Sequence, residues 1–225
     1  MLPRCFYDRD PVELAPLLLN KLLVLRGSAD GPRRAVRIVE VEAYRGQLDP
    51  ASHARRGPTA RNATMFGRGG HLYVYFTYGM HWCANVVAGP PGTAGAVLVR
   101  AGAPVASPRG RAAMWAARPG ARRAEELAAG PARLCQALGI SGLDDGADLV
   151  AGDRGLILVD DGVAPPADPR ASGRVGIRRA VEQPWRFWVP GDPHVSPGRP
   201  GPPSGSRSAA EQPGSGPVAP DRTPR

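Results

Sequence analysis

The most regular pattern in the chain is an alternation of residue types across positions 36–44. Successive side chains of a β-strand point to opposite faces of the sheet, so every second residue shares a face. The segment therefore predicts a strand on which two carboxylates and a tyrosine end the same face: Glu40, Glu42 and Tyr44.

Two runs rich in β-branched and aromatic residues, 72–78 and 81–87, are separated only by Gly79 and Met80. A two-residue connection with glycine first is typical of a type II′ hairpin. The pattern predicts a β-hairpin with Tyr78 and Met80 at its exposed tip.

The remaining pattern predicts strands at 22–25, 96–101, 155–159, 174–178 and 185–189. A helix should begin at Pro11, with Asp10 as its cap, and Pro16 should kink or shorten it. Further helices are expected at 109–118, 122–129 and 131–138. Because strands and helices do not alternate regularly, the pattern favours an α+β fold over a doubly wound sheet.

The last 36 residues, from Pro190, contain ten prolines and six glycines and have almost no apolar periodicity. Such a segment cannot bury enough apolar surface to offset its chain entropy, so its composition predicts a disordered tail. The rest of the 225-residue chain is long enough to form a sizeable core.

The charge distribution points to a polyanionic partner. The formal net charge is +9, and Lys21 is the only lysine among 29 basic residues. No acid occurs between Asp49 and Glu125, whereas ten arginines do. A long acid-free and positively charged stretch is typical of nucleic-acid binding, although a basic surface without a partner would give the same count.

Nothing in the sequence predicts export or membrane insertion. The longest apolar stretch, 14–24, is interrupted by Pro16, Asn20 and Lys21, and no signal-peptide cleavage pattern follows it. The three cysteines are far apart and form no CxxC pair. A cytoplasmic protein without a disulfide framework or a zinc cluster is expected.

Glu42 is the first candidate for chemistry, because it ends an otherwise apolar strand. A carboxylate in that position either pairs with an arginine or serves as a base. Glu40 is the same residue type on the same face, and spacing alone cannot separate the two. His53, alone in a loop, carries little information by itself.

Tyrosines gather in the same part of the chain, at Tyr44, Tyr73, Tyr75 and Tyr78. Packing in a half-buried sheet explains most tyrosines. An aromatic side chain at a hairpin tip in a basic protein can also stack on a nucleic-acid base.

Several segments carry a stronger signal when they are taken in order: IVEVEAYRG (38–46), DPASH (49–53), RN (61–62), MFG (65–67), LYVYFTYGM (72–80) through Asn85, GPARLCQAL (130–138), RVGI (174–177) and WRFW (185–188). Together they resemble the alkyladenine (3-methylpurine) DNA glycosylase family over residues 8–196. Asn20 departs from that pattern, because the family usually has glycine there.

The resemblance implies a single compact domain, with a curved antiparallel β-sheet flanked by helices and a protruding β-hairpin. It also implies a domain over residues 1–196, which leaves a disordered Pro/Gly-rich tail at 197–225. The activity implied is the release of damaged purines, such as 3-methyladenine, from double-stranded DNA.

The resemblance also implies roles for individual residues. Glu42 matches the general base that activates water. Tyr44, His53 and Tyr75 match the walls of the pocket for the extruded base. Asn85 matches the pocket residue that crowds the 2-amino group of guanine.

The DNA contacts follow in the same way. Tyr78, with Met80 beside it, matches the wedge that fills the gap left in the duplex. Arg100 matches a position beside the pocket and the backbone of the flipped nucleotide, and Arg61 lies in a matching segment. Both arginines are expected to contact DNA.

The expected enzyme is monomeric, acts near the nucleoid and needs no cofactor or metal. A glycosylase that also cuts the strand uses an amine nucleophile. Lys21 is expected to be solvated or to face phosphate, which favours a monofunctional enzyme. Two alternatives stay open: a non-catalytic binder of damaged DNA, and a glycosidase of free nucleosides.

Overall fold

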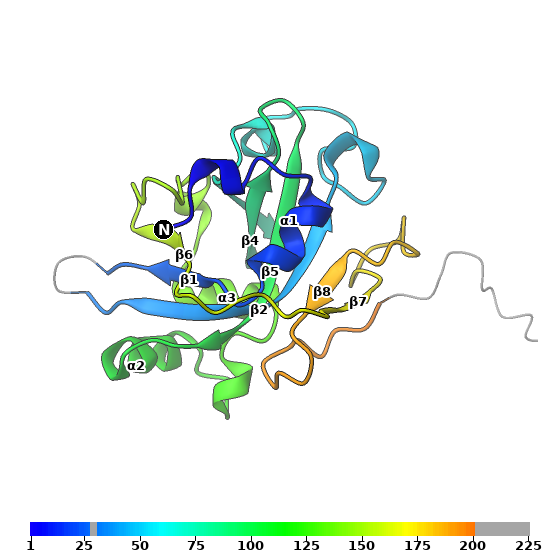
Figure 1. Cartoon of the computed structure of the whole chain (residues 1–225). Coiled ribbons are helices and arrows are strands. Elements are labelled where there is room, and N and C mark those ends of the chain that lie inside the picture. The colour runs from blue at the N-terminus through cyan, green and yellow to red at the C-terminus, as the bar shows by residue number, and fades with distance from the viewer. Residues whose placement is uncertain (28–30, 201–225) are drawn as a thin grey trace, which may run out of the picture.

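The longest strand, β2 (Arg34–Tyr44), lies at the centre of an eight-stranded antiparallel sheet in the computed structural model, which describes residues 1–27 and 31–200 (Figure 1). The strand order is β3-β4-β5-β2-β1-β6, and β8 and β7 continue from β2. The other strands are β1 (Leu22–Leu25), β3 (Leu72–Thr77), β4 (His81–Ala88), β5 (Gly95–Pro104), β6 (Leu156–Val159), β7 (Arg170–Ser172) and β8 (Arg186–Trp188).

Three of the described strands pair with β2. β5 runs along one edge, while β1 pairs with residues 34–37 and β8 with residues 40–42 on the other. The pairing with β5 is irregular between Ile38 and Val41. An irregularity of this kind bends a strand and increases its twist. Glu40 lies within this irregularity, and Glu42 follows it.

Within the described residues, three α-helices accompany the sheet: α1 (Pro11–Leu18), α2 (Pro108–Ala117) and α3 (Pro131–Leu138). The side chain of Asp10 accepts a hydrogen bond from the Val12 N–H at 2.9 Å, which confirms the predicted start of α1. Pro16 lies inside α1, and the helix ends two residues later. α1 packs on β2 and β5, α3 on β4 and β5, and α2 against α3.

Asn20 adopts φ of +66°, in the left-handed region that favours glycine. Asparagine tolerates this region better than most residues do. Its side chain also donates a 2.7 Å hydrogen bond to the Ala164 carbonyl. The chain therefore accommodates this departure from the glycine of the family pattern.

Two predicted elements are wrong. Residues 122–129 form only a 3₁₀ turn, Ala124–Glu126, because the Glu126 carboxylate accepts the Arg122 N–H and Ala129 bridges to Ala101. Residues 174–178 form no strand, since Val175 makes one isolated bridge and donates its N–H to Glu42.

The hairpin turn also differs from the prediction. Thr77 pairs directly with His81, so the loop contains three residues rather than two. Tyr78 and Gly79 have φ of +51° and +67°, and the Met80 N–H donates to the Thr77 carbonyl. Two successive positive φ values match a type I′ rather than a type II′ turn. Tyr78 and Met80 still lie at the tip.

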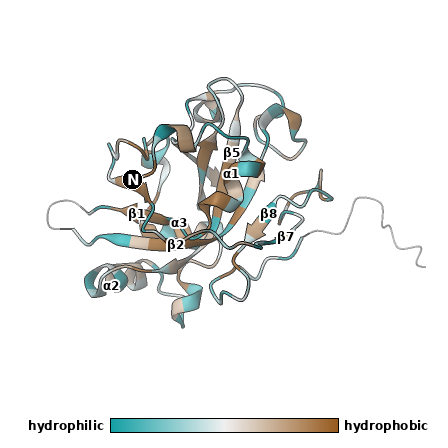
Figure 2. Ribbon diagram, viewed as in Figure 1, coloured by the Kyte–Doolittle hydropathy of each residue, from teal (hydrophilic) through white to brown (hydrophobic). Residues whose placement is uncertain are grey.

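The strands at the centre of the sheet are mostly hydrophobic, whereas α2 mixes hydrophilic and hydrophobic residues (Figure 2). One core cluster joins residues of β2, β4 and β5 to α1 and α3. The predicted α+β class and single compact domain are confirmed. None of the helices described within residues 1–27 and 31–200 is long and apolar enough to cross a membrane.

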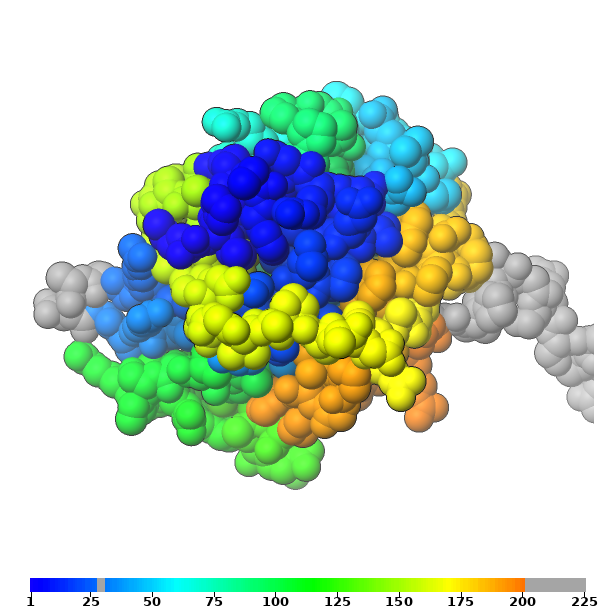
Figure 3. All heavy atoms as spheres, in the orientation of Figure 1, coloured from blue at the N-terminus to red at the C-terminus, as the bar shows by residue number. Residues whose placement is uncertain are grey.

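The N-terminal residues and α1 form one continuous surface, below which the segment between β6 and β7 crosses the molecule (Figure 3). Composition suggested disorder from Pro190, but this is wrong for the first residues of that segment. Ser196 is buried and bonded to β2. The predicted boundary at 196 stays a prediction, because most of the segment 197–225 lies outside the described residues.

Candidate active site

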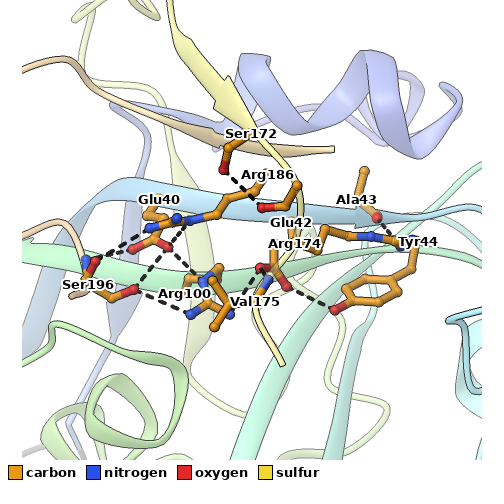
Figure 4. Close-up of polar contacts among 11 residues, drawn as sticks. Glu40, Glu42, Ala43, Tyr44, Arg100, Ser172, Arg174, Val175, Arg186 and Ser196 are labelled. Atoms are coloured by element: carbon orange, nitrogen blue, oxygen red, sulfur yellow. Dashed lines mark hydrogen bonds and ion pairs between the residues drawn. The ribbon is translucent and has the colours of Figure 1, made fainter. Parts of the chain in front are cut away.

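The Glu42 carboxylate is fully buried at the end of β2 and is held from two sides (Figure 4). The Val175 N–H donates to Oε1 at 2.7 Å, and the Tyr44 hydroxyl donates to Oε2 at 2.9 Å. An Arg100 guanidinium nitrogen lies 3.2 Å from Oε1. A carboxylate has about four lone-pair positions, so these three contacts leave one of the four without a donor.

The neighbouring carboxylate, Glu40, has a different environment. Nε of Arg100 and Nε of Arg186 each lie 2.7 Å from its Oε1, and the Ser196 N–H donates to Oε2 at 2.7 Å. Burial alone would raise the pKa of Glu40, but the two arginines and Ser196 hold that pKa below its usual value. The sequence could not separate the two acids. The structure does, because Glu40 is enclosed by structural partners.

A cavity of about 480 Å³ opens beside Glu42. Its lining brings together the four predicted pocket residues, Tyr44, His53, Tyr75 and Asn85. Glu42 lies behind the lining, and the groups that contact it (Tyr44, Arg100 and Val175) line the cavity themselves.

The aromatic walls of the cavity have a defined geometry. The His53 ring meets the Tyr75 ring edge-on, with 4.5 Å between centroids, and Tyr73 stacks on Tyr75 at 5.6 Å. Nδ1 of His53 lies 3.2 Å from the Tyr73 hydroxyl. Desolvation, followed by the charge of Arg61, lowers the pKa of His53 and so favours the neutral imidazole.

Asn85 is buried in β4, where it pairs with Tyr73 of β3 and Leu98 of β5. Its side-chain N–H donates to the Tyr73 carbonyl at 3.1 Å. This bond fixes the amide at the cavity wall.

Both predicted wedge residues are exposed at the hairpin tip. Tyr78 is 83% exposed and Met80 is 65% exposed, and Tyr78 also lines the cavity mouth. An exposed tyrosine in a left-handed conformation has no packing role in the isolated protein that would explain its position.

The predicted arginines lie at different depths. Arg100 is buried between Glu40 and Glu42. Arg61 is at the surface, where it donates to the Phe76 carbonyl at 3.0 Å and lies 5.9 Å from the Tyr75 ring centroid. Arg178 and Arg179 were not predicted as site residues, yet both are exposed and line the cavity.

Three further cavity groups were missed: Tyr73, the Cys83 thiol and the Val175 N–H. Tyr73 and Tyr75 are two residues apart on β3 and face Asn85 and Cys83 on β4. The period of two could therefore have identified Tyr73 and Cys83. A backbone donor such as the Val175 N–H leaves no signal in residue type.

The expectation for Lys21 is wrong. Lys21 is buried, and its ammonium group lies 2.8 Å from an Asp160 carboxylate oxygen. It is therefore neither solvated nor free to face phosphate. Its place beside β1 and β6 is separate from the cavity lining.

Taken together, the site combines three parts: an aromatic slot formed by Tyr44, His53 and Tyr75, the buried carboxylate of Glu42 with its fixed donors, and a cationic rim. The rim consists of the exposed Arg178 and Arg179. Such a site suits an electron-poor aromatic group with an anion attached to it.

Comparison with known proteins agrees with this chemistry. The family model described as methylpurine-DNA glycosylase (MPG) matches residues 5–193. A Burkholderia lata protein named "Putative 3-methyladenine DNA glycosylase" is 56% identical over 87% of this chain and 91% of its own length. Proteins of the same name from Streptomyces avermitilis and Methanocella arvoryzae are 48% and 46% identical, and the matches cover 88% and 89% of this chain and 92% and 98% of theirs. The chain belongs to the methylpurine-DNA glycosylase family.

Proposed function

We propose that this protein is a monofunctional DNA glycosylase that extrudes damaged purines from double-stranded DNA and hydrolyses their N-glycosidic bond. Family membership supports the glycosylase class. The observation that carries the mechanism is Glu42, a buried carboxylate fixed by Tyr44 and Val175 directly behind an aromatic cavity.

Extrusion is required because a base inside a duplex cannot reach a buried carboxylate. Extrusion costs a few kcal/mol, and less for a damaged or mispaired base, which supplies part of the selectivity. The exposed ring of Tyr78 can stack in the vacated gap and offset part of that cost. Arg61 and the rim arginines can hold the phosphates without reading sequence.

Within the cavity, the rings of Tyr44, Tyr75 and His53 can enclose the purine. A neutral His53 does not repel a cationic methylpurine, whereas tyrosine faces attract one. The Asn85 amide at the cavity wall is suited to crowd the 2-amino group of an undamaged guanine.

Cleavage develops positive charge on the deoxyribose. The Glu42 carboxylate can stabilise that charge and accept a proton from the attacking water. A methylpurine that is already cationic leaves without protonation. Cationic lesions such as 3-methyladenine should therefore be released faster than neutral ones such as hypoxanthine.

The direct test is incubation with duplex DNA that contains alkylated purines, followed by alkali to cleave at abasic sites. The expected result is release of free methylpurine and alkali-dependent strand breaks, with the protein acting as a monomer. Breaks that form without alkali, or borohydride trapping of a protein–DNA adduct, would show an amine-based lyase instead. Tight binding of the lesion without base release would show a damage-binding protein.

A further inference from the structure

Arg174 lies outside the cavity lining, and its guanidinium lies beside Ala43 and Tyr44 at the end of β2 (Figure 4). It is fully buried and forms a two-pronged ion pair with Asp49, with 2.9 Å between Nη2 and Oδ1. It also donates to the Ala43 carbonyl at 2.9 Å. Its guanidinium carbon lies 4.6 Å from the Tyr44 ring centroid and 5.0 Å from that of Trp185.

Stability alone is a weak reason for this arrangement. Both members of the pair have no exposed side-chain surface, and Nε of Arg174 has no hydrogen-bond partner among the described residues. Burying such a pair costs desolvation that hydrophobic side chains of similar volume would avoid. A buried donor without a partner adds to that cost.

The contacts of Arg174 converge on the two donors that hold Glu42. Its guanidinium backs the Tyr44 ring, whose hydroxyl donates to Oε2. Residue 175 follows it in the chain and donates its N–H to Oε1. Asp49, the ion-pair partner of Arg174, lies four residues before His53 of the cavity wall. Its carboxylate also accepts a hydrogen bond from the Ala51 N–H.

The backbone on both sides of Arg174 is constrained by its contacts. A Cβ on Gly173 would lie 2.6 Å from the Val181 carbonyl oxygen, so only glycine fits there. On the N-terminal side of Arg174, the backbone is constrained by the close approach of Gly173 to Val181. On the C-terminal side, it is constrained by the hydrogen bond from the Val175 N–H to Glu42.

We propose that Arg174 is a positioning residue for Glu42: through Tyr44 and Val175 it fixes the direction in which the carboxylate points. This inference rests on the proposed function. It predicts that Arg174 affects the rate of base release far more than it affects DNA affinity.

The test uses Arg174→Lys, which keeps the charge but cannot reproduce the planar fork or the ring contacts. Single-turnover release of methylpurines is measured on duplex DNA treated with dimethyl sulfate, well below the melting temperature of each variant. Misplacing a catalytic group slightly can cost about 100-fold, so a rate loss of that order is expected. The Kd for an abasic duplex and the fraction of active protein should stay at the wild-type values.

A second variant separates positioning from stability. Arg174→Met combined with Asp49→Leu replaces the buried pair with hydrophobic side chains and leaves no unpaired charge. It should fold, and it should stay as slow as Arg174→Lys. Recovery of the wild-type rate in the double variant would overturn the proposal, because the pair would then serve stability only.

Leu158→Ala is the matched control, because Leu158 is fully buried in β6 and does not line the cavity. It should lower the melting temperature and keep the wild-type rate of release; an equal slowing would overturn the proposal. Wild-type protein that releases no methylpurine would refute the proposed function itself. Active wild-type protein with equally active Arg174 variants would refute only the positioning role.

Discussion

The hydroxyl of Tyr44 donates a 2.9 Å hydrogen bond to Oε2 of Glu42, while the ring of the same tyrosine lines the cavity. Burial, followed by the nearby charge of Glu42, raises the pKa of Tyr44 well above its usual value. The hydroxyl therefore stays protonated and remains a donor at every physiological pH. One side chain links the surface proposed to contact the purine to the group proposed to activate water.

Tyr44→Phe should slow base release and keep the shape of the pocket. A hydrogen bond to a charged group contributes about 1.5–3 kcal/mol, which corresponds to a rate loss of about 10- to 100-fold. Single-turnover kinetics on alkylated duplex would measure it. Tyr7→Phe is the matched control, because the buried Tyr7 hydroxyl has no partner among the described residues. A loss of similar size in both variants would contradict the role given to Tyr44.

Glu42→Gln should abolish most of the activity without weakening DNA binding. The amide cannot act as a base, and its NH₂ group cannot accept one of the two hydrogen bonds that Glu42 accepts. General-base catalysis contributes about 10²- to 10⁴-fold, and a loss in that range is expected. Gel-shift affinity for the lesion duplex, measured in parallel, should be retained. A Gln variant that releases base at the wild-type rate would exclude Glu42 as the base.

Tyr78→Ala should leave stability unchanged, since the side chain is 83% exposed. Base stacking is worth about 1–3 kcal/mol, so release from duplex DNA should fall by about 10-fold or more. Single-stranded alkylated DNA offers no gap to fill and should be affected less. Leu143→Ala, at a site that is 86% exposed and away from the cavity, provides the control. Equal losses on both substrates would argue against a wedge.

Arg178→Ala and Arg179→Ala should each weaken binding to any duplex, damaged or not. An arginine that contacts a phosphate contributes about 0.9 to the slope of log K against log salt concentration. Each substitution should reduce the slope by about that amount in a fluorescence-anisotropy titration. Arg170→Ala, an exposed arginine outside the cavity lining, should leave the slope unchanged. If Arg178→Ala and Arg179→Ala have the same slope as the Arg170→Ala control, neither Arg178 nor Arg179 contacts DNA phosphates.

Glu40→Gln should destabilise the fold in a pH-dependent way. The folded-state pKa of Glu40 is lowered, so between that pKa and the ordinary value of 4.5 the unfolded chain binds more protons than the folded one. The stabilisation that the ionised Glu40 contributes is therefore complete above pH 4.5, the ordinary pKa, and is lost as the pH falls through the folded-state pKa.

At pH 7 the Gln variant leaves Arg100 and Arg186 with an uncharged partner, and the expected loss is about 3–5 kcal/mol. In denaturant unfolding, the difference in the free energy of unfolding between wild type and Glu40→Gln should become smaller as the pH is lowered. Asp161→Asn, which breaks the half-exposed Arg37–Asp161 pair, should cost only about 0–1 kcal/mol. A loss of stability in Glu40→Gln that is the same at every pH would contradict a lowered pKa of Glu40 in the folded protein.

Local patterns predicted the elements whose signals are short-range. The alternation in residues 36–44 located the carboxylates, and their shared contact with Arg100 confirms that Glu40 and Glu42 lie on one face. The Asp10 cap located the start of α1 correctly, because a cap depends on neighbouring residues only. The helix predicted at 131–138 is α3, and Gly139 ends it in the left-handed conformation that favours glycine.

Elements that depend on distant partners were not predictable in this way. Residues 174–178 have the composition of a strand, yet Arg174 pairs with an aspartate 125 positions earlier in the chain. The helix expected at 122–129 gave way to the contacts of Glu126 and to a bridge with β5. The two carboxylates of β2 could be told apart only by what surrounds each of them.

The place of Ser196 has a consequence for how the protein is made. Synthesis delivers Glu40 and Arg100 early, whereas Arg186 and Ser196, which complete the environment of Glu40, emerge some 90 residues after Arg100. A domain generally folds as a unit, so the environment of Glu40 in β2 cannot reach its final form before Arg186 and Ser196 have been synthesised. A nascent chain arrested before Arg186 would carry the hairpin, the aromatic slot and the partners of Glu42, but it would lack two of the three residues that hold Glu40.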